Sequence, residues 1–198
     1  MNTEYSYDCK AIKNDLEDLL TEKRFEHTLG VAYTAAALAM AYDEDMQKAY
    51  VAGLLHDCTK YMSQDENLVF CKNHHITLSK AELKTSSLLH AKTGCKMAEE
   101  KYHIKDPEIL NAICFHTTGC PDMTMLEKII FIADYIEPQR CFDPDLPFIR
   151  NMAFHNLNEA IIKILRNTLV HLEQSATTID PMTQKTYDFY CRMEKQHD

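Results

Sequence analysis

The sequence has 198 residues, 45% of them hydrophobic and 26% charged, and a formal net charge of −9. This composition is typical of a soluble globular protein and excludes extensive disorder, while the acidic balance argues against binding to DNA or RNA, which needs a basic face. The N-terminus has no signal pattern, and the longest stretch of low polarity, Leu29 to Ala41, is too short to cross a bilayer. We therefore expect a cytoplasmic protein that does not contact membranes.

The pattern along the chain is helical. Four glycines, no hairpin dipeptide and no sustained alternation of apolar and polar residues leave little material for a sheet. We predict helices near residues 8 to 21, 24 to 42, 45 to 56, 64 to 73, 80 to 89, 91 to 102, 107 to 115, 125 to 137 and 148 to 174. No repeat and no Gly/Ser linker is present, so we expect one domain, 1–198, with an N-terminal helix and a core at about 24–175.

Capping residues mark several of the predicted helix starts. SQDE at residues 63 to 66, SKAE at 79 to 82 and TMLE at 124 to 127 fit the capping box, in which the first and fourth side chains satisfy backbone N–H groups reciprocally. Asp106 followed by proline gives an N-cap with proline at the first helical position. These local signals predict where the helices begin.

Two carboxylates occur where the neighbouring residues indicate a buried core. The run VAGLLHDCTKY at 51 to 61 ends in an adjacent His56-Asp57 pair, and Asp134 interrupts the apolar run IIFIADYI at 129 to 136. A carboxylate out of water costs free energy unless a partner compensates its charge. Both positions therefore require a partner elsewhere in the chain.

Histidines in similar surroundings are candidates for that partner. His27, His90 and His116 each lie on or at the end of a predicted helix, beside apolar residues. Each one alone is more typical of a hydrogen-bonded core or surface histidine than of a metal ligand. Together with the His56-Asp57 pair and Asp134 they give four imidazoles and two carboxylates on separate helices, and helical bundles build metal sites from side chains that converge in this way.

Three longer strings carry a family resemblance: GLLHDCTK at 53 to 60, HTTG at 116 to 119 and LEKIIFIADYIEPQR at 126 to 140. With these strings, the sequence resembles the HD superfamily of metal-dependent phosphohydrolases and, within it, the YqeK-type symmetrical bis(5'-nucleosyl)-tetraphosphatases. The resemblance runs from about Arg24 to the helix after Pro147. It is loose at DPMTQ, residues 180 to 184, from which no site residue is carried over.

The resemblance implies an all-α, HD-type helical bundle with a buried binuclear metal site. The family positions that bind the two metals match His27, His56, Asp57, His90, His116 and Asp134. The metal in the family is commonly iron, and the mixture of imidazole and carboxylate ligands also suits manganese, zinc or nickel. We expect Asp57 to bridge the ions, with His90 and His116 on one ion and His27, His56 and Asp134 on the other.

The implied reaction is hydrolysis of a dinucleoside polyphosphate, diadenosine tetraphosphate, to two ADP. Two cations lower the pKa of a bridging water, so hydroxide can attack an internal phosphorus at neutral pH. Lys60, about one turn after Asp57, and Arg140 are expected to act with Asp57 in catalysis and to bind substrate phosphate. By residue type alone, both cations are more typical of a solvated surface.

Other polar residues near the motifs also have plainer explanations. Thr117, Thr118 and Gly119 offer hydroxyl and N–H groups to substrate phosphate or base, although the same string is typical of a helix end. Arg24 and Glu26 flank His27 but fit an exposed helix start. The remaining histidines have no matching family position and are expected on the surface: His74, His75, His103, His155, His171 and His197.

Other functions fit the same residues. The ligand set alone does not distinguish this substrate from nucleoside monophosphates, deoxynucleoside triphosphates or cyclic nucleotides. A nucleotide-binding sensor would keep the fold without turnover, and in a helical interaction module the histidines would be incidental. The resemblance also allows a homodimer, which no feature of the sequence requires.

Overall fold

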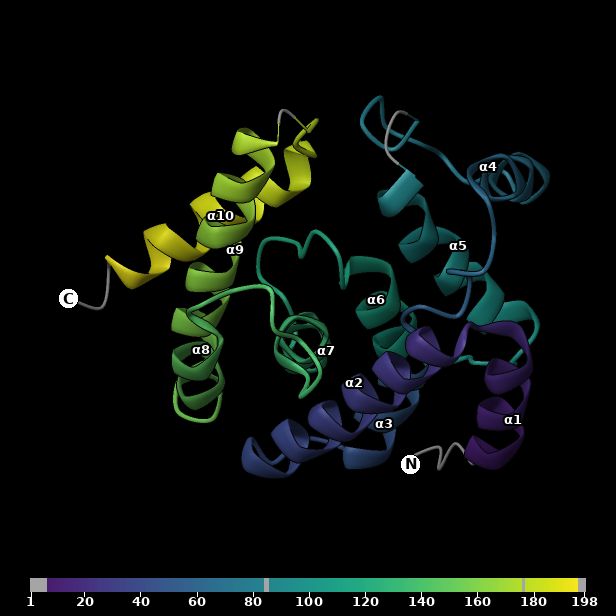
Figure 1. Cartoon of the computed structure of the whole chain (residues 1–198), viewed down its shortest axis with the longest axis horizontal. Helices are drawn as coiled ribbons and strands as arrows, with labels where there is room; N and C mark the ends of the chain where they lie inside the picture. The colour runs from purple at the N-terminus through teal and green to yellow at the C-terminus, as the bar shows by residue number, and fades with distance from the viewer. Residues whose placement is uncertain (1–6, 84–85, 176, 196–198) are drawn as a thin grey trace.

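The computed structural model describes residues 7–83, 86–175 and 177–195, and over these ranges the chain forms helices and no strands. The helices are α1 (Cys9–Leu19), α2 (Glu22–Ala41), α3 (Met46–Leu55), α4 (Gln64–Asn73), α5 (Ser86–Glu100), α6 (Pro107–Phe115), α7 (Met125–Ile136), α8 (Leu146–Ala153), α9 (Leu157–Gln174) and α10 (Pro181–Glu194). They form one bundle (Figure 1). The predicted all-α fold is confirmed.

Helix α7 lies at the centre of this bundle (Figure 1). Helices α2, α3, α6 and α9 all pack against it, and most of its 12 residues are buried. A helix that is apolar nearly all round can only be stable inside a core, because it has no polar face to turn to water. The residues of α7 are therefore fixed from several sides, and Asp134 is among them.

Helices α2 and α3 pack closely because small residues line their contact. A Cβ atom placed on Gly53 of α3 would lie 2.7 Å from the Cα of Ala32 in α2, a separation that real atoms do not adopt. Glycine is therefore required for this approach. The close packing brings His27 of α2 to the end of α3, where His56 lies.

The helix starts that depend on local capping are largely confirmed. Both hydrogen bonds of the capping box form at residues 63 to 66, before α4, and at 124 to 127, before α7. Asp106 accepts a hydrogen bond from the backbone N–H of Glu108, with Pro107 at the first position of α6. Each of these caps needs only residues two or three positions apart, which explains why the sequence reveals them.

The predicted start of a helix at residue 80 and the predicted break between helices at 80 to 89 and 91 to 102 are wrong, although residues 91–100 are helical as predicted. Residues 80–83 form a turn, 84–85 lie outside the described residues, and α5 is a continuous helix from Ser86 to Glu100. The capping hydrogen bonds between Ser79 and Glu82 do form, but no helix follows immediately. The Glu82 carboxylate is also bound by Lys92 of α5, at 2.8 Å, so a tertiary ion pair fixes this turn against α5.

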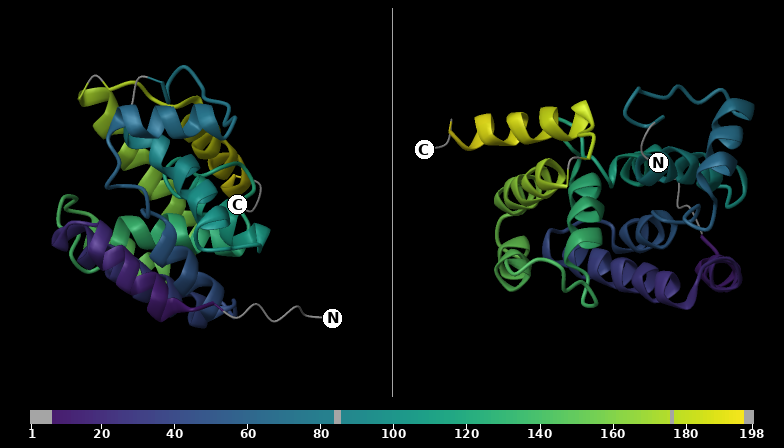
Figure 2. Two further views of the ribbon diagram at one scale, coloured as in Figure 1. Left: turned by 90° about the vertical axis from the view of Figure 1, so that its right-hand side faces the viewer. Right: turned by 45° about the horizontal axis from the view of Figure 1, so that its top comes forward.

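The predicted helix at 148 to 174 is divided into α8 and α9. Asn156 interrupts it with an extended backbone, and its side chain accepts hydrogen bonds from the N–H groups of Asn158 and Glu159. Helix α10 was not predicted, although it begins with the same Asp-Pro signal as α6, here Asp180 and Pro181. It packs against α9 and runs along an outer edge of the bundle (Figure 2).

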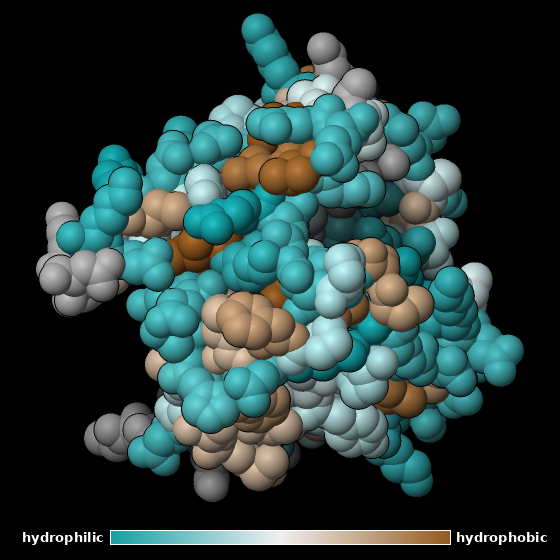
Figure 3. Space-filling view, turned by 60° about the vertical axis from the view of Figure 1, so that its left-hand side comes forward, coloured by the Kyte–Doolittle hydropathy of each residue, from teal (hydrophilic) through white to brown (hydrophobic). Residues whose placement is uncertain are grey.

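The surface near α8 and α9 carries several exposed apolar side chains, including Phe148, Phe154 and Val170. Figure 3, which brings this side forward, shows apolar areas interrupted by hydrophilic ones. Isolated apolar residues of this kind are ordinary on protein surfaces and require no partner. Among the described helices, none has both the length and the apolar character that a membrane span requires.

We predict that Gly53→Ala destabilises the fold. The added methyl group meets the backbone of Ala32, and overpacking of this kind costs about 1–3 kcal/mol, more than the roughly 1 kcal/mol that alanine gains over glycine in a helix. Gly94→Ala is the matched control, because its nearest neighbour would lie at an ordinary 3.5 Å. Urea denaturation should place the Gly53→Ala midpoint below the wild-type value and the Gly94→Ala midpoint at or above it; the reverse order would refute the close contact.

Candidate metal centre

Six side chains of the metal-ligand type converge inside the bundle, and they are the six predicted from the sequence. They come from α2 (His27), the end of α3 (His56 and Asp57), α5 (His90), the end of α6 (His116) and α7 (Asp134). Five of the six residues are buried, and the side chain of Asp134 is 24% exposed. The cluster therefore lies within the core and opens to solvent near Asp134.

The Asp57 carboxylate lies between two groups of imidazoles. Its Oδ2 atom is 3.5 Å from Nε2 of His56 and 3.8 Å from Nε2 of His27. Its Oδ1 atom is 3.1 Å from Nε2 of His90 and 3.8 Å from Nε2 of His116. One carboxylate thus presents a separate oxygen to each pair, which is the arrangement that a bridging ligand requires.

Two sets of these atoms are close enough to hold a metal ion. The ligand atoms of His27, His56 and Asp134 lie within 4.8 Å of one another, and so do those of His56, Asp57 and His116. Nε2 of His90 lies 3.0 Å from Nε2 of His116, beside the second set. Imidazole with carboxylate suits divalent transition metals, so the donors at this position fit the metal that the resemblance implies.

Three of the histidines are oriented by hydrogen bonds from their other ring nitrogen. Nδ1 of His56 is 2.7 Å from the carbonyl oxygen of Gly53, and Nδ1 of His116 is 2.7 Å from that of Ile113. A carbonyl oxygen can only accept, so Nδ1 carries the hydrogen and Nε2 of the neutral ring carries the lone pair. The orientation that a metal ligand needs is therefore built into both helix ends.

His27 is oriented by a residue that the sequence did not indicate. Its Nδ1 atom lies 3.0 Å from Oε1 of Glu137, which is almost completely buried. The other oxygen of Glu137 accepts from the backbone N–H of Gln139 at 2.7 Å. The only sequence signal for this role was an acidic residue, Glu137, directly after the apolar run of α7. The sequence could not pair Glu137 with His27, because the two residues are 110 positions apart.

His90 differs from the other three. Its Nδ1 atom lies 3.1 Å from Nζ of Lys60, which in its charged form can only donate. For Nε2 of His90 to carry the lone pair, Nδ1 must hold the hydrogen, so Lys60 must then be neutral or turned away. Burial lowers the pKa of Lys60, and the Asp57 carboxylate opposes that shift.

Burial and the neighbouring charges set the protonation of the cluster. Burial opposes the negative charge of Asp57, but His56 and His90 outweigh it and hold the pKa of Asp57 well below its usual value. Burial, reinforced by the nearby His90 and His56, lowers the pKa of His116 to about 3. Burial also lowers the pKa of His90. At His56, burial lowers the pKa, but the Asp57 and Asp134 carboxylates outweigh burial and raise it. Metal binding, which needs the neutral imidazole, must therefore displace a proton from His56.

Two arginines contact the carboxylates of the cluster. Nη1 of Arg24 lies 2.7 Å from Oδ2 of Asp57, and Nη2 of Arg140 lies 2.5 Å from Oδ1 of Asp134. Their side chains are 36% and 29% exposed, so they line the route from solvent to the cluster. The expectation that Arg24 belongs to an exposed helix start is wrong, because its guanidinium turns inward to Asp57; its neighbour Glu26 is exposed.

The segment that carries Arg140 is fastened to α8 by Arg150. The Arg150 guanidinium donates to the carbonyl oxygens of Ile136, Glu137 and Arg140 at 2.8, 2.8 and 2.9 Å. Arg140 itself donates through Nε to the carbonyl oxygen of Asp134 at 2.9 Å. No sequence pattern indicates this role for Arg150, because it depends on the packing of α7 against α8.

Of the three residues that follow His116 at the end of α6, only Thr117 contacts the cluster through its side chain. The hydroxyl of Thr117 lies 3.2 Å from Nε2 of His116, at the cluster. The hydroxyl of Thr118 instead donates to the carbonyl oxygen of Gly119, whose φ of 62° lies in the left-handed region typical of a helix end. The structure therefore brings Thr117 to the site, and Gly119 serves the chain turn.

The other histidines lie away from the cluster. Four are exposed, as expected: His75, His103, His155 and His171. His74 is partly buried against Glu100, with Nδ1 3.1 Å from Oε1, and His197 lies outside the described residues.

Comparison with known proteins agrees with this geometry. Residues 24–139 match the HD domain family, over more than half of the chain. The chain belongs to the HD-domain family. It is 43% identical over 171 residues to a symmetrical bis(5'-nucleosyl)-tetraphosphatase of Halalkalibacterium halodurans, a match that covers 85% of this chain and 89% of the relative. The corresponding protein of Bacillus subtilis is 35% identical over 189 residues, covering 96% and 97%. The resemblance inferred from the sequence motifs is therefore confirmed.

A solved structure has the same fold. An HD superfamily hydrolase from Clostridium acetobutylicum, described as involved in NAD metabolism, superposes with a TM-score of 0.91 at 37% sequence identity. The superposition covers 96% of this chain and all of the other. The HD-type helical bundle expected from the sequence is therefore confirmed over nearly its whole length.

We predict that Glu137→Gln weakens metal binding by about 10- to 100-fold, the usual cost of removing a partner that orients a metal-binding histidine. A glutamine oxygen cannot accept from both the His27 ring and the Gln139 N–H, so one contact is lost. Glu26→Gln, at an exposed position one residue before His27, is the matched control. Titration of the metal-free protein with iron(II) or manganese(II) measures both; equal affinities would contradict a positioning role for Glu137.

Proposed function

We propose that this protein is a metal-dependent hydrolase that cleaves diadenosine tetraphosphate symmetrically into two ADP. The observation that carries this proposal is the convergence of four imidazoles on the two oxygens of one buried carboxylate, Asp57. The names of the bacterial relatives, which are symmetrical bis(5'-nucleosyl)-tetraphosphatases, support the choice of substrate.

The charges around the cluster suit an anionic substrate. The chain has a net charge of −9, yet Arg24, Lys60 and Arg140 gather beside the cluster. A tetraphosphate that approaches the open side meets Arg24 and Arg140 before it reaches the buried ligands. It also meets the Lys60 ammonium when that group is turned away from His90. Local positive charge in an acidic protein concentrates polyphosphate there without attracting nucleic acid to the rest of the surface.

In this proposal, His27, His56 and Asp134 would hold one metal ion, His90 and His116 would hold the second, and Asp57 would be shared between the two. Two bound cations would activate water and neutralise charge on the phosphoryl oxygens. Iron is the proposed metal, and manganese, zinc and nickel suit the same ligands. The chain's own contribution is to hold six ligands rigidly in a core from which bulk water is excluded.

Lys60 and Arg140 are proposed to bind the phosphate chain and stabilise the charge that develops during cleavage. The Arg140 guanidinium is held by Asp134 through two atoms, which directs it across the opening of the cluster. Thr117 adds a hydroxyl beside His116, and Thr118 is proposed to contribute its backbone N–H group. The N–H of Gly119, which was expected to bind substrate, instead donates to the carbonyl oxygen of Phe115 at 2.8 Å. A cytoplasmic location, expected from the sequence, and a homodimer, which the family resemblance allows, complete the proposal.

The decisive measurement is product analysis. Protein purified without oxygen and supplied with iron(II) or manganese(II) should convert diadenosine tetraphosphate to ADP alone. Asp57→Asn should lower kcat by more than about 100-fold, because losing a ligand costs more than losing a residue that orients one. Asp18→Asn, at an exposed position on α1, is the matched control and should retain full activity.

Each other outcome excludes part of the proposal. ATP with AMP as products would mean attack on an outer phosphorus and would refute symmetrical cleavage. Turnover of NAD, a nucleoside monophosphate, a deoxynucleoside triphosphate or a cyclic nucleotide in preference would reassign the substrate. Metal and nucleotide binding without turnover would indicate a sensor, and a protein that binds no metal would indicate an interaction module.

Arginine at position 140 is expected to be required for its shape as well as its charge. In Arg140→Lys, a single ammonium cannot replace the guanidinium contacts to both Oδ1 and the carbonyl oxygen of Asp134. We expect kcat/KM to fall about 10- to 100-fold, the scale of one charged hydrogen bond. Arg166→Lys, at an exposed position, should leave the rate unchanged. An unchanged rate for Arg140→Lys would remove Arg140 from the mechanism.

A further inference from the structure

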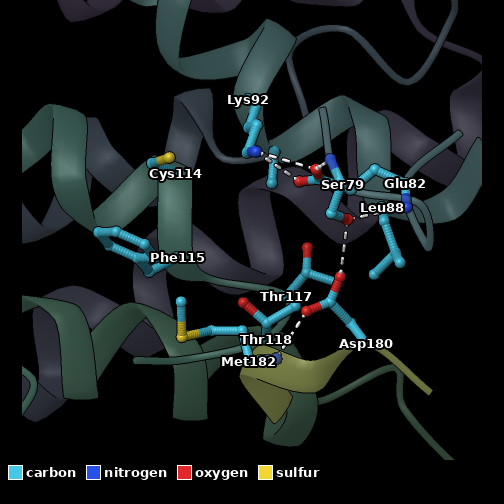
Figure 4. A pocket seen from close by; sticks show the side chains of 11 residues that line it. Ser79, Glu82, Leu88, Lys92, Cys114, Phe115, Thr117, Thr118, Asp180 and Met182 are labelled. Atoms are coloured by element: carbon cyan, nitrogen blue, oxygen red, sulfur yellow. Dashed lines mark hydrogen bonds and ion pairs between the residues drawn. The ribbon is translucent and has the colours of Figure 1, made fainter. Parts of the chain in front are cut away.

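A small pocket adjoins the candidate metal centre on the side of His90 and His116. Its volume is about 140 Å³, and its walls come from the turn before α5, from α5, from the end of α6 and from the start of α10 (Figure 4). Asp180 and Met182, near the C-terminal end of the chain, supply one wall. The C-terminal segment thus reaches a cavity beside the site, although no site residue was expected there.

Thr117 connects the pocket to the centre. It lines the pocket, and its hydroxyl oxygen lies 3.2 Å from Nε2 of His116 and 3.5 Å from Nε2 of His90. Phe115, which also lines the pocket, directly precedes His116 in the sequence. Thr117 therefore lies between the cluster and this pocket and contacts both.

The walls are apolar with an acidic acceptor at one side. Leu88, Phe115 and Met182 provide apolar surface, and Lys92 is already bound by Glu82 at 2.8 Å (Figure 4). Asp180 is buried, and two neutral donors contact its carboxylate: the N–H of Met182 at 2.7 Å and the hydroxyl of Ser79 at 3.4 Å. An ionised carboxylate accepts up to about four hydrogen bonds, so Asp180 retains capacity for a ligand N–H group.

These features fit a nucleobase. The volume is below the roughly 300–1,000 Å³ of pockets for drug-sized ligands and suits one ring system. The Phe115 ring and the aliphatic side chains of Leu88 and Met182 can pack against the faces of a base. A carboxylate accepts from an amino group on the edge of the base, as the N6 amino group of adenine provides. A phosphate is disfavoured in the same space, because Asp180 would repel it.

We propose that this pocket seats one base of the substrate, with the exocyclic amino group directed at Asp180, so that the start of α10 determines base preference. The proposal rests on the proposed function for its substrate and adds a specificity residue to it. The sugar and phosphates would extend past Thr117 toward the cluster. The C-terminal helix is then part of the binding site.

The test compares adenine with hypoxanthine, which carries a carbonyl oxygen in place of the amino group. Wild-type kcat/KM for diadenosine tetraphosphate should exceed that for diinosine tetraphosphate by at least about tenfold. In Asp180→Asn the new amide can donate to the carbonyl, and this preference should fall by at least about tenfold. Asparagine is also a good N-cap, so α10 keeps its start. Asp188→Asn, exposed on the same helix, should keep the wild-type preference.

Calorimetric binding of ADP and IDP to the metal-loaded protein separates this proposal from the proposed function. If diadenosine tetraphosphate is not hydrolysed but wild type binds ADP better than IDP and Asp180→Asn does not, the proposed reaction fails and the base pocket stands. A wild-type protein that does not discriminate ADP from IDP would overturn the pocket assignment. So would an Asp180→Asn variant with an unchanged preference.

Discussion

A charged carboxylate removed from water is costly unless its surroundings replace the lost hydration, and the bundle is arranged around one such group. The side chain of Asp57 is only 3% exposed. Four imidazoles from α2, α5 and the ends of α3 and α6 approach its oxygens, and Arg24 adds a positive charge at 2.7 Å. Each of these helices must therefore hold its position to within a few tenths of an ångström for the carboxylate to remain compensated. The central position of α7, which contacts most of them, provides that rigidity.

Helices α3 and α6 orient a histidine ring at their C-terminal ends in the same way. The last carbonyl groups of a helix have no partner within the helix. His56 and His116 each stand just past the end of a helix and bond a carbonyl three residues earlier. One contact thus satisfies an unpaired carbonyl and leaves the opposite ring nitrogen available for a ligand. At both positions, the hydrogen bond that completes the end of the helix also orients the histidine as a ligand.

The sequence revealed what depends on near neighbours. The helix starts at 63, 106 and 124 follow from caps a few residues long, and the six clustered side chains stood out because polar residues interrupt apolar runs. The residues it did not reveal depend on contacts between distant positions. Arg24 meets Asp57 across 33 positions, and Glu137 meets His27 across 110. The break at Asn156 was missed for a different reason: an apolar helical pattern runs through it, and a single asparagine cap outweighs that pattern.

The hydrogen bonds from Arg150 to backbone carbonyl oxygens fix the loop that carries Arg140 before a ligand binds. They join α8, which contributes none of the clustered side chains, to the backbone on both sides of Glu137 and to Arg140. A loop whose carbonyl groups are already bonded has lost its conformational freedom before any ligand arrives. The entropic cost of ordering that loop is therefore part of the free energy of folding. It does not reduce the affinity for an incoming anion.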